Sequence, residues 1–416
     1  MAAACYTVLN SMHMSAVLYT FFIVLQVILL FYLLIPTFFL VLYWLKRLLG
    51  RKPRTWGALQ LENTKEYSFA AIITAHKNLE LVPPLVDSLL KQHYRNYKIY
   101  VVADACEEVT LHFDDPTVII LQPPTALNAK IKSIDYAINH FVEPHDALII
   151  FDADNLVHPD YLAILNVYFN RGYRAVQTNM LPKNTDSLMA RLDAAGNLYY
   201  NFIDRRMRME LGMSAHIWGL GIAIETALYK SILYQNFLGG FDKKVQADIV
   251  RQVPILAYAE DAIVYDEKID SGAALEKQRT RWLYAYFKYF RYSVAVLWAG
   301  ITRFSFNLFF FGLQLLRPPI LLQLLAAALF FLINVVVSPT WAWYWVGTGV
   351  VFVLTFFGIV ASMTRNKEIV NALYSLPLVL FHQLRALFNM KRATKAYLKT
   401  ENSKVVYIQD LLNTKK

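Results

Sequence analysis

The chain has 416 residues, of which 56% are hydrophobic and 17% charged, and its formal net charge is +10. It is too apolar for an ordinary soluble protein of this size, and the positive charge suits a protein that lies against anionic lipid. No basic-aromatic module of a nucleic-acid-binding protein is present, so we expect no nucleic-acid partner. Its two cysteines, Cys5 and Cys106, exclude a disulfide framework and a zinc or iron–sulfur site built from thiolates.

The first long apolar run extends from Val17 to Leu45 and contains no charged residue. About 20 such residues cross the hydrocarbon layer of a membrane. The run lacks the basic start and the small-residue cleavage site of a signal peptide. We therefore interpret residues 17–45 as a retained transmembrane helix. The basic stretch Leu45–Arg54 follows it, which places this end of the helix in the cytoplasm by the positive-inside rule.

Residues 60–282 predict a water-soluble, cytoplasmic domain in which short strands alternate with helices. Helical spacing of apolar residues begins at Val82 and again at Leu127, and the strand-like runs are Phe69–Thr74, Lys98–Asp104, Val118–Leu121 and Ala147–Asp152. This alternation predicts an α/β domain whose mostly parallel sheet carries helices on both faces. Such sheets bind ligands beyond the carboxyl ends of their strands, where Asp104 and Asp152 fall.

The chain becomes apolar again after this domain. Residues 283–304 are aromatic and moderately basic and predict an interfacial helix, with an ordinary packed helix as the alternative. Residues 305–362 contain two apolar runs that predict a hairpin of transmembrane helices, Ile320–Val337 and Trp341–Val360. Residues 368–416 predict a second interfacial helix and a cytoplasmic tail. We expect a multi-pass protein of the cell (inner or plasma) membrane.

The sequence FDADN places two carboxylates, Asp152 and Asp154, at the end of a predicted strand. Two carboxylates in this position suit a hard divalent cation such as Mg²⁺ or Mn²⁺, which prefers oxygen ligands and leaves room for phosphate oxygens. The ion would neutralise the charge of a departing diphosphate. A solvated turn is the alternative for the tripeptide alone, and its position at a strand end favours the metal.

Other polar residues have two interpretations each. Asp104 could bind a ribose or nucleobase, or cap a turn. Lys130 opens a predicted helix whose N-terminus favours anions, although a solvated lysine would look the same. Asp242 in GGFDKK is either a helix N-cap or a general base. Glu260 and Asp261 are further candidates for that base, and spacing alone does not choose among the three.

The sequence QRTRW supplies Gln278, Arg281 and Trp282. An arginine fork binds a diphosphate bidentately, and a tryptophan face can stack on a sugar ring. The alternative is an arginine and tryptophan pair that anchors a helix at the membrane surface.

In this order, the strand-end Asp, the helix Lys, DxD, G-G-F-D, VYDEK and Q-x-x-R-W resemble the family 2 membrane glycosyltransferases. These are relatives of cellulose, hyaluronan and poly-N-acetylglucosamine synthases, and the resemblance covers about Phe69 to Trp282. It implies a GT-A-type nucleotide-binding domain and a metal-dependent, inverting reaction. A sugar would move from a nucleotide sugar, expected to be UDP-linked, to a hydroxyl of a growing polysaccharide.

The resemblance also implies roles for individual residues. Asp104 would contact the nucleotide, and Lys130 would lie near its diphosphate. Asp152 and Asp154 would hold the metal diphosphate, with Asp154 as the more direct ligand. Asp242 falls at the catalytic carboxylate of the family.

Gln278, Arg281 and Trp282 would shape the acceptor site and the diphosphate end. The implied partners are a nucleotide-sugar donor, a carbohydrate or lipid-linked acceptor, membrane lipid, and a second copy of the chain or an export protein.

The sequence departs from the family pattern in three places. The turn after the first strand is TAHKN, in which Ala75 remains a candidate substrate contact but Lys77 replaces an Asn. Lys243 follows Asp242 where the family has a Glu-Asp pair, and WGLG stands for an acceptor loop of Gly-Thr-Gly. The departures at Lys77 and Lys243 leave open an inactive scaffold that binds sugar nucleotides. A single addition to a lipid-linked acceptor also stays open, because about three spanning helices do not assure a channel within one chain.

Overall fold

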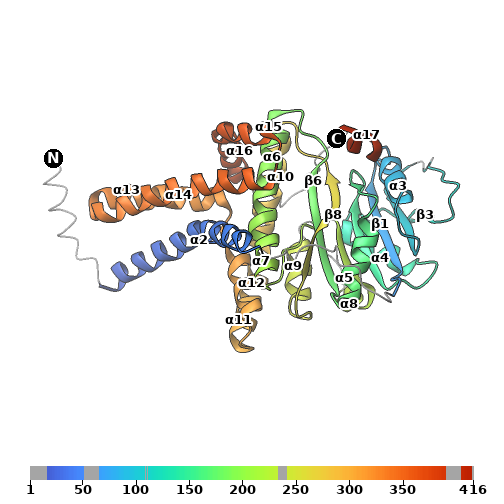
Figure 1. Cartoon of the computed structure of the whole chain (residues 1–416), viewed down its shortest axis with the longest axis horizontal. Coiled ribbons are helices and arrows are strands. Elements are labelled where there is room, and N and C mark those ends of the chain that lie inside the picture. The colour runs from blue at the N-terminus through green and yellow to red at the C-terminus, as the bar shows by residue number, and fades with distance from the viewer. Residues whose placement is uncertain are drawn as a thin grey trace. The chain divides into compact units, whose positions relative to one another are not determined.

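The computed structural model describes residues 16–50, 65–107, 109, 111–232, 241–389 and 404–414. The chain separates into two compact units, one formed by Met1–Lys52 with Arg317–Leu373 and the other by Pro53–Leu316 with Tyr374–Lys416. Figure 1 shows the elements of both units. Cys5, Gly239 and Gly240, and the basic residues 51–54, which carry some of the expectations above, lie outside the described residues.

The first unit is built from three long apolar helices: α2 (Ala16–Leu48), α13 (Ile320–Val337) and α14 (Pro339–Met363). Each is long and apolar enough to cross a membrane. The helices pack against one another, and Gln26, Asn334 and Trp345 make polar contacts between them. Gln26 Oε1 accepts hydrogen bonds from Asn334 Nδ2 (2.7 Å) and Trp345 Nε1 (2.9 Å), as expected where no water can satisfy them. The short helix α15 (Lys367–Ala372) follows these helices, and the boundary between the two units falls within η2 (Leu373–Ser375).

The second unit contains an eight-stranded sheet of order β3-β2-β1-β4-β7-β6-β8-β5. β1 pairs in parallel with β2 and β4, and β2 with β3. β7 is antiparallel to both β4 and β6, so β6 and its parallel partner β8 run in the direction of β4. The carboxyl ends of β1, β2, β4, β6 and β8 therefore share one edge. The strands are β1 (Phe69–His76), β2 (Tyr97–Asp104), β3 (Val118–Leu121), β4 (Ala147–Asp152), β5 (Leu156–Val157), β6 (Ala175–Pro182), β7 (Ile222–Glu225) and β8 (Ala257–Asp266).

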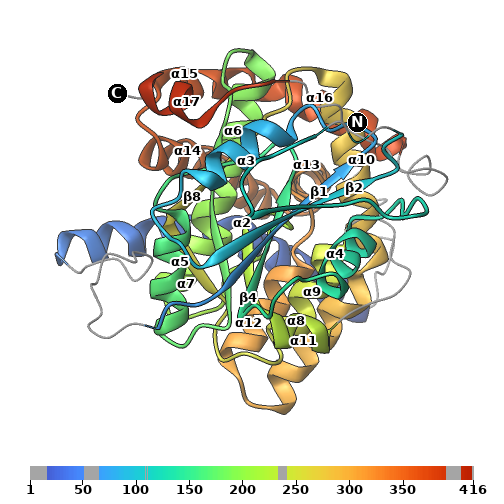
Figure 2. The ribbon, with the colours of Figure 1, turned by 90° about the vertical axis from the view of Figure 1, so that its right-hand side faces the viewer.

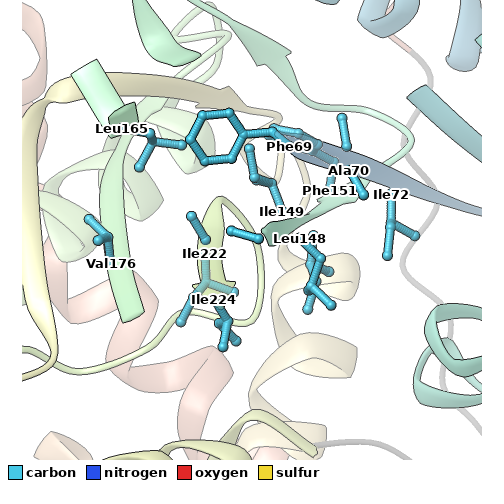
Figure 3. Packing of buried hydrophobic residues seen from close by; sticks show 14 of the residues in the cluster. Phe69, Ala70, Ile72, Leu148, Ile149, Phe151, Leu165, Val176, Ile222 and Ile224 are labelled. Atoms are coloured by element: carbon cyan, nitrogen blue, oxygen red, sulfur yellow. The ribbon is translucent and has the colours of Figure 1, made fainter. Parts of the chain in front are cut away.

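The predicted mostly parallel α/β sheet is confirmed. Its central strands are apolar without alternation because helices cover both faces. Phe69, Ile72 and Phe151 are fully buried, and Figure 3 shows side chains of β1, β4, β6, β7 and α5 packed together. Figure 2 shows α3 and α4 on opposite sides of β1 and β2. The helices that follow the strands are α3 (Val82–Leu90), α4 (Lys130–Asn139), α5 (Tyr161–Asn170), α8 (Thr226–Ser231) and α9 (Phe241–Ile249).

Two helices beside the sheet begin at serine N-caps. The Ser187 and Ser271 side chains accept hydrogen bonds from the backbone N–H groups of Ala190 and Ala274, which fixes where α6 (Leu188–Asn201) and α10 (Gly272–Lys288) start. α6 continues through the π-helical turn η1 (Phe202–Arg206) into α7 (Met207–Glu210).

The remaining helices of this unit are α11 (Phe290–Thr302), α12 (Phe306–Leu316), α16 (Leu376–Phe388) and α17 (Ile408–Thr414). The segment 283–304, predicted as one helix, comprises the end of α10 and the whole of α11, with Tyr289 between them. α16 packs along α10, and α12 packs along α11.

Candidate functional site

Asp104 ends β2 and is only 2% exposed. Its Oδ1 accepts a hydrogen bond from the backbone N–H of Leu127 (2.6 Å) and its Oδ2 from that of Asn128 (2.9 Å). Oδ2 also lies 2.9 Å from His76 Nδ1. The carboxylate therefore fixes the loop that leads into α4 and orients the histidine at the end of β1.

An open pocket of about 520 Å³ is lined by residues that directly follow β1 and β2. Lys77 and Ala105 line it, and both adopt the left-handed backbone conformation, with φ values of 64° and 54°. Such a conformation is unfavourable for residues with a side chain and often marks a functional site. Ala75, in contrast, is buried in the core, so its methyl group does not face this pocket.

Lys130 is the first residue of α4 and joins several of the predicted site residues. Its Nζ donates to Asp152 Oδ1 (2.6 Å) and to the carbonyl oxygen of Gly219 (3.0 Å) in the WGLG loop. Gly219 has φ 89°, and a Cβ there would lie 3.2 Å from Asp242 Cβ. Burial raises the pKa of Asp242, while the charges of Lys243 and Lys130 act to lower it. The structure thus brings Lys130, Asp152 and Asp242 together.

Asp154 is 6% exposed and faces other carboxylates. Burial, together with the negative charges of Asp266 and Asp152, raises its pKa to about 8. Burial also raises the pKa of Asp266, against the opposing charge of Lys268. A divalent cation would relieve this repulsion, so the donor set fits one in its chemistry. No cluster of three or more side chains placed as metal ligands occurs within the described ranges. Phosphate oxygens and water would have to complete the coordination of such an ion.

Four further residues at this edge were not assigned roles from the sequence. Lys183, just after β6, donates from Nζ to the backbone oxygen of Asp154 (3.0 Å) and lies 3.3 Å from Glu267 Oε2. Lys268 Nζ donates to Asp266 Oδ2 (2.8 Å). Asp266, Glu267 and Lys268 belong to the VYDEK motif, and that motif was the only sequence feature that could have pointed to them. The sequence does not show that these residues lie near Asp154, because that depends on β8 ending at the same edge of the sheet as β4.

Glu260 and Asp261 lie within β8 rather than at its end. The Glu260 carboxylate pairs with Arg206 of η1 at 3.2 Å. The register of β6 and β8 is interrupted at these two acids, because Thr178 pairs with Ala259 and the next residue, Asn179, pairs with Ile263. Of the three candidate bases, Asp242 lies next to Gly219, whose carbonyl oxygen Lys130 contacts, whereas the Glu260 carboxylate is paired with Arg206.

The QRTRW residues lie on α10, where Trp282 is 39% exposed. The ring of Trp282 lies 6.4 Å from that of Trp218 in the WGLG loop. The Arg205 guanidinium stacks 3.9 Å from the Trp218 ring, and that of Arg279 lies 4.2 Å from the Trp282 ring. This aromatic cluster (Trp218, Trp282, Arg205 and Arg279) joins η1 to α10.

Gln278 and Arg281 are half-buried on the same helix. Gln278 Oε1 is buried and accepts no hydrogen bond from the residues that the structure describes. Leaving a buried acceptor without a donor costs free energy, so this oxygen is suited to accept a hydrogen bond from a hydroxyl group of a ligand.

Comparison with known proteins agrees with this geometry. Residues 67–285, more than half of the 416, match the model of the family described as "Glycosyltransferase like family 2". Among solved structures the chain is similar to the mannosyltransferase PcManGT from Pyrobaculum calidifontis, solved in complex with GDP-Man and Mn²⁺. The identity is 14% and the TM-score 0.55, with 89% of this chain and 100% of that chain covered.

A second similar structure is TarS 1–349 from S. aureus in complex with UDP-GlcNAc. It shares 14% identity over 82% of this chain and 99% of that one, and its TM-score of 0.41 is too low to support an argument. No curated protein sequence matches the chain. The fold is GT-A-like, as predicted, and the chain belongs to glycosyltransferase family 2.

Proposed function

We propose that the protein is a membrane-bound, inverting glycosyltransferase that moves a sugar from a nucleotide sugar to a hydroxyl group of a growing polysaccharide. The observation that carries the proposal is the meeting of Lys130, Asp152 and Asp242 at the carboxyl edge of the sheet. In a family 2 glycosyltransferase this edge is the natural place for a nucleotide sugar.

The donor would lie along this edge. Its nucleotide would occupy the pocket beside Asp104 and Lys77, and its diphosphate would reach Lys130. Asp152 and Asp154 would hold Mg²⁺ or Mn²⁺, and the ion would supply positive charge to the leaving diphosphate. The similar mannosyltransferase was solved with GDP-Man and Mn²⁺, which supports a divalent cation here.

Asp242 is the proposed general base. Burial raises its pKa, and a base is most effective when its pKa approaches the working pH. Its carboxylate would take the proton of the acceptor hydroxyl as the hydroxyl oxygen attacks the anomeric carbon. The bond from that carbon to the diphosphate breaks, and the electron pair leaves with the phosphate oxygen. One attack from the face opposite the leaving group inverts the anomeric centre.

The acceptor would approach from the aromatic cluster. The exposed face of Trp282 can stack on a sugar ring, and Gln278 Oε1 can accept a hydrogen bond from a sugar hydroxyl. A lipid-linked acceptor that receives a single sugar is the second candidate. This candidate is favoured because the described part of the chain has three candidate spans. Three helices are few for the wall of a polysaccharide channel, unless a second copy of the chain or an export partner supplies more.

Purified protein in detergent should release a nucleoside diphosphate from one of a panel of UDP- and GDP-sugars in the presence of Mn²⁺ or Mg²⁺. Asp242→Asn removes the base and should reduce release by about 10²–10⁴-fold. Asp154→Asn removes a proposed metal ligand, so it should abolish release of the nucleoside diphosphate even when metal is added. Asp114→Asn changes an exposed carboxylate and serves as the matched control.

Release by Asp154→Asn at the wild-type rate would refute the metal assignment. Inactivity of the wild type with every donor would favour a scaffold that binds sugar nucleotides. The size of the labelled product separates a polymer from a single addition.

A further inference from the structure

The segment Lys404–Thr414, here called the C-terminal segment, follows the last candidate span and belongs to the same compact unit as the sheet. Its helix α17 contacts α3, beside which it lies in Figure 1. Ile408 and Leu411 are buried in one apolar cluster with Leu156 of β5 and Tyr265 of β8. The segment therefore covers the short strand β5, which ends the sheet order, as folded proteins commonly cover an edge strand.

The residues under the C-terminal segment belong to the ladder that supports the acidic site. Leu156 and Tyr265 are register partners in the antiparallel pair β5·β8. Leu156 follows Asp154 by two positions, and Tyr265 directly precedes Asp266. The apolar contact with Ile408 and Leu411 therefore supports the backbone segments that carry Asp154 and Asp266.

A chain of polar contacts connects the segment to Asp154. The backbone N–H of Lys404 donates to Glu267 Oε2 (3.1 Å), and that oxygen lies 3.3 Å from Lys183 Nζ. Lys183 Nζ in turn donates to the backbone oxygen of Asp154 (3.0 Å). The Lys183 and Glu267 side chains are only 2% and 7% exposed. Each buried charge depends on the other, because a buried charge without its partner is strongly unfavourable.

We propose that the C-terminal segment is a positioning element of the donor site. It holds Glu267 against Lys183, and Lys183 holds the turn at Asp154 in the conformation that presents the carboxylate to a metal diphosphate. Its effect on catalysis rests on the function proposed above, whereas its effect on the turn does not.

The test is made on the full-length chain. Ile408→Asp combined with Leu411→Asp places charges in the apolar cluster and should release the segment. Gln409→Asp adds the same kind of charge at an exposed position of α17 and is the control. Hydrogen exchange of the backbone amides in 152–157 and 264–268 should accelerate at least tenfold in the double variant and stay unchanged in the control. Exchange in β2 should remain slow in both variants, since β2 lies in the well-packed core.

A second pair of variants tests the polar chain. Lys183→Met removes the donor to Asp154 and should accelerate exchange in 152–157 while it raises the KM for the donor sugar. Lys183→Arg keeps a donor and a positive charge and should restore most of both properties. A positioning role would be contradicted if Lys183→Arg restored neither the slow exchange in 152–157 nor the KM for the donor sugar.

The inference fails if release of the segment leaves exchange in 152–157 unchanged, if β2 loses protection as well, or if the double variant transfers sugar faster than the wild type. Failure of the proposed function would give a different result. The wild type would transfer no sugar, although hydrogen exchange in 152–157 would still accelerate when the C-terminal segment is released.

Discussion

Asp242 experiences two opposing influences, because burial raises its pKa and the charges of Lys243 and Lys130 lower it. As a general base it works only when deprotonated, so kcat/KM should rise with pH through its pKa. Lys243→Ala removes a cation that favours the carboxylate, which raises the pKa further. The acid limb of the pH profile of kcat/KM should therefore move to higher pH.

The control for this prediction is Lys132→Ala, which removes a charge of the same sign from an exposed position of α4. The measurement is sugar transfer by both variants across the pH range in which the protein stays folded. A profile for Lys243→Ala that coincides with that of the control would argue against Asp242 as the base.

Single residues were predictable from the sequence where a strand end and a polar motif coincide. Lys130, Asp152 and Asp242 were all singled out, and the structure brings them together. Glu260 remained an alternative because the sequence reveals neither the irregularity of β8 at this residue nor its pairing with Arg206. Lys183 was missed because its contact with the backbone of Asp154 depends on which strands are neighbours in space.

At the scale of elements, the four strands predicted between Phe69 and Asp152 correspond to β1–β4. These segments are recognisable because apolar runs and intervening helices alternate along the chain. The place of β7 was not predictable. It has four residues and lies antiparallel between β4 and β6, a pairing that is remote in sequence. The break at Tyr289 was also missed, since the aromatic pattern continues through it.

The pair α11 and α12 depends on two glycines for its close approach. A Cβ on Gly300 would collide with the backbone of Phe309, and one on Gly312 with the backbone of Leu297. A backbone cannot move aside as a flexible side chain can, so the helices would have to separate. Gly300→Ala or Gly312→Ala should lower the free energy of unfolding by about 1–3 kcal/mol, the usual cost of overpacking.

Gly196→Ala is the matched control for this prediction. Gly196 lies within α6, and a Cβ there would meet no atom within 4 Å. Alanine forms helices better than glycine by up to ~1 kcal/mol, so this change should be neutral or stabilising. Thermal unfolding of the three variants in the same detergent provides the comparison, and equal midpoints would contradict close packing at α11 and α12.

At the scale of the whole molecule, connectivity constrains which parts of the chain can meet. The sheet and the C-terminal segment belong to one compact unit, yet α13 and α14 separate them in sequence. If both helices cross the membrane, the chain returns to the side on which it started. A single crossing would leave the sheet and α17 on opposite sides. Contact of α17 with α3 therefore supports a hairpin of two spans.

We propose that this common side is the cytoplasmic one, because Lys46 and Arg47 lie in the last turn of α2. Single cysteines introduced into a variant without Cys5 and Cys106 can test this arrangement in intact cells. Thr340→Cys, at the start of α14, should react with a maleimide that does not cross membranes. Lys132→Cys in α4 and Gln409→Cys in α17 should react only after the cells are opened. The contradicting result is that Gln409→Cys and Thr340→Cys both react in intact cells while Lys132→Cys does not. Gln409 would then lie on the opposite side of the membrane from the sheet, which would exclude both the hairpin and the contact of the C-terminal segment with the sheet.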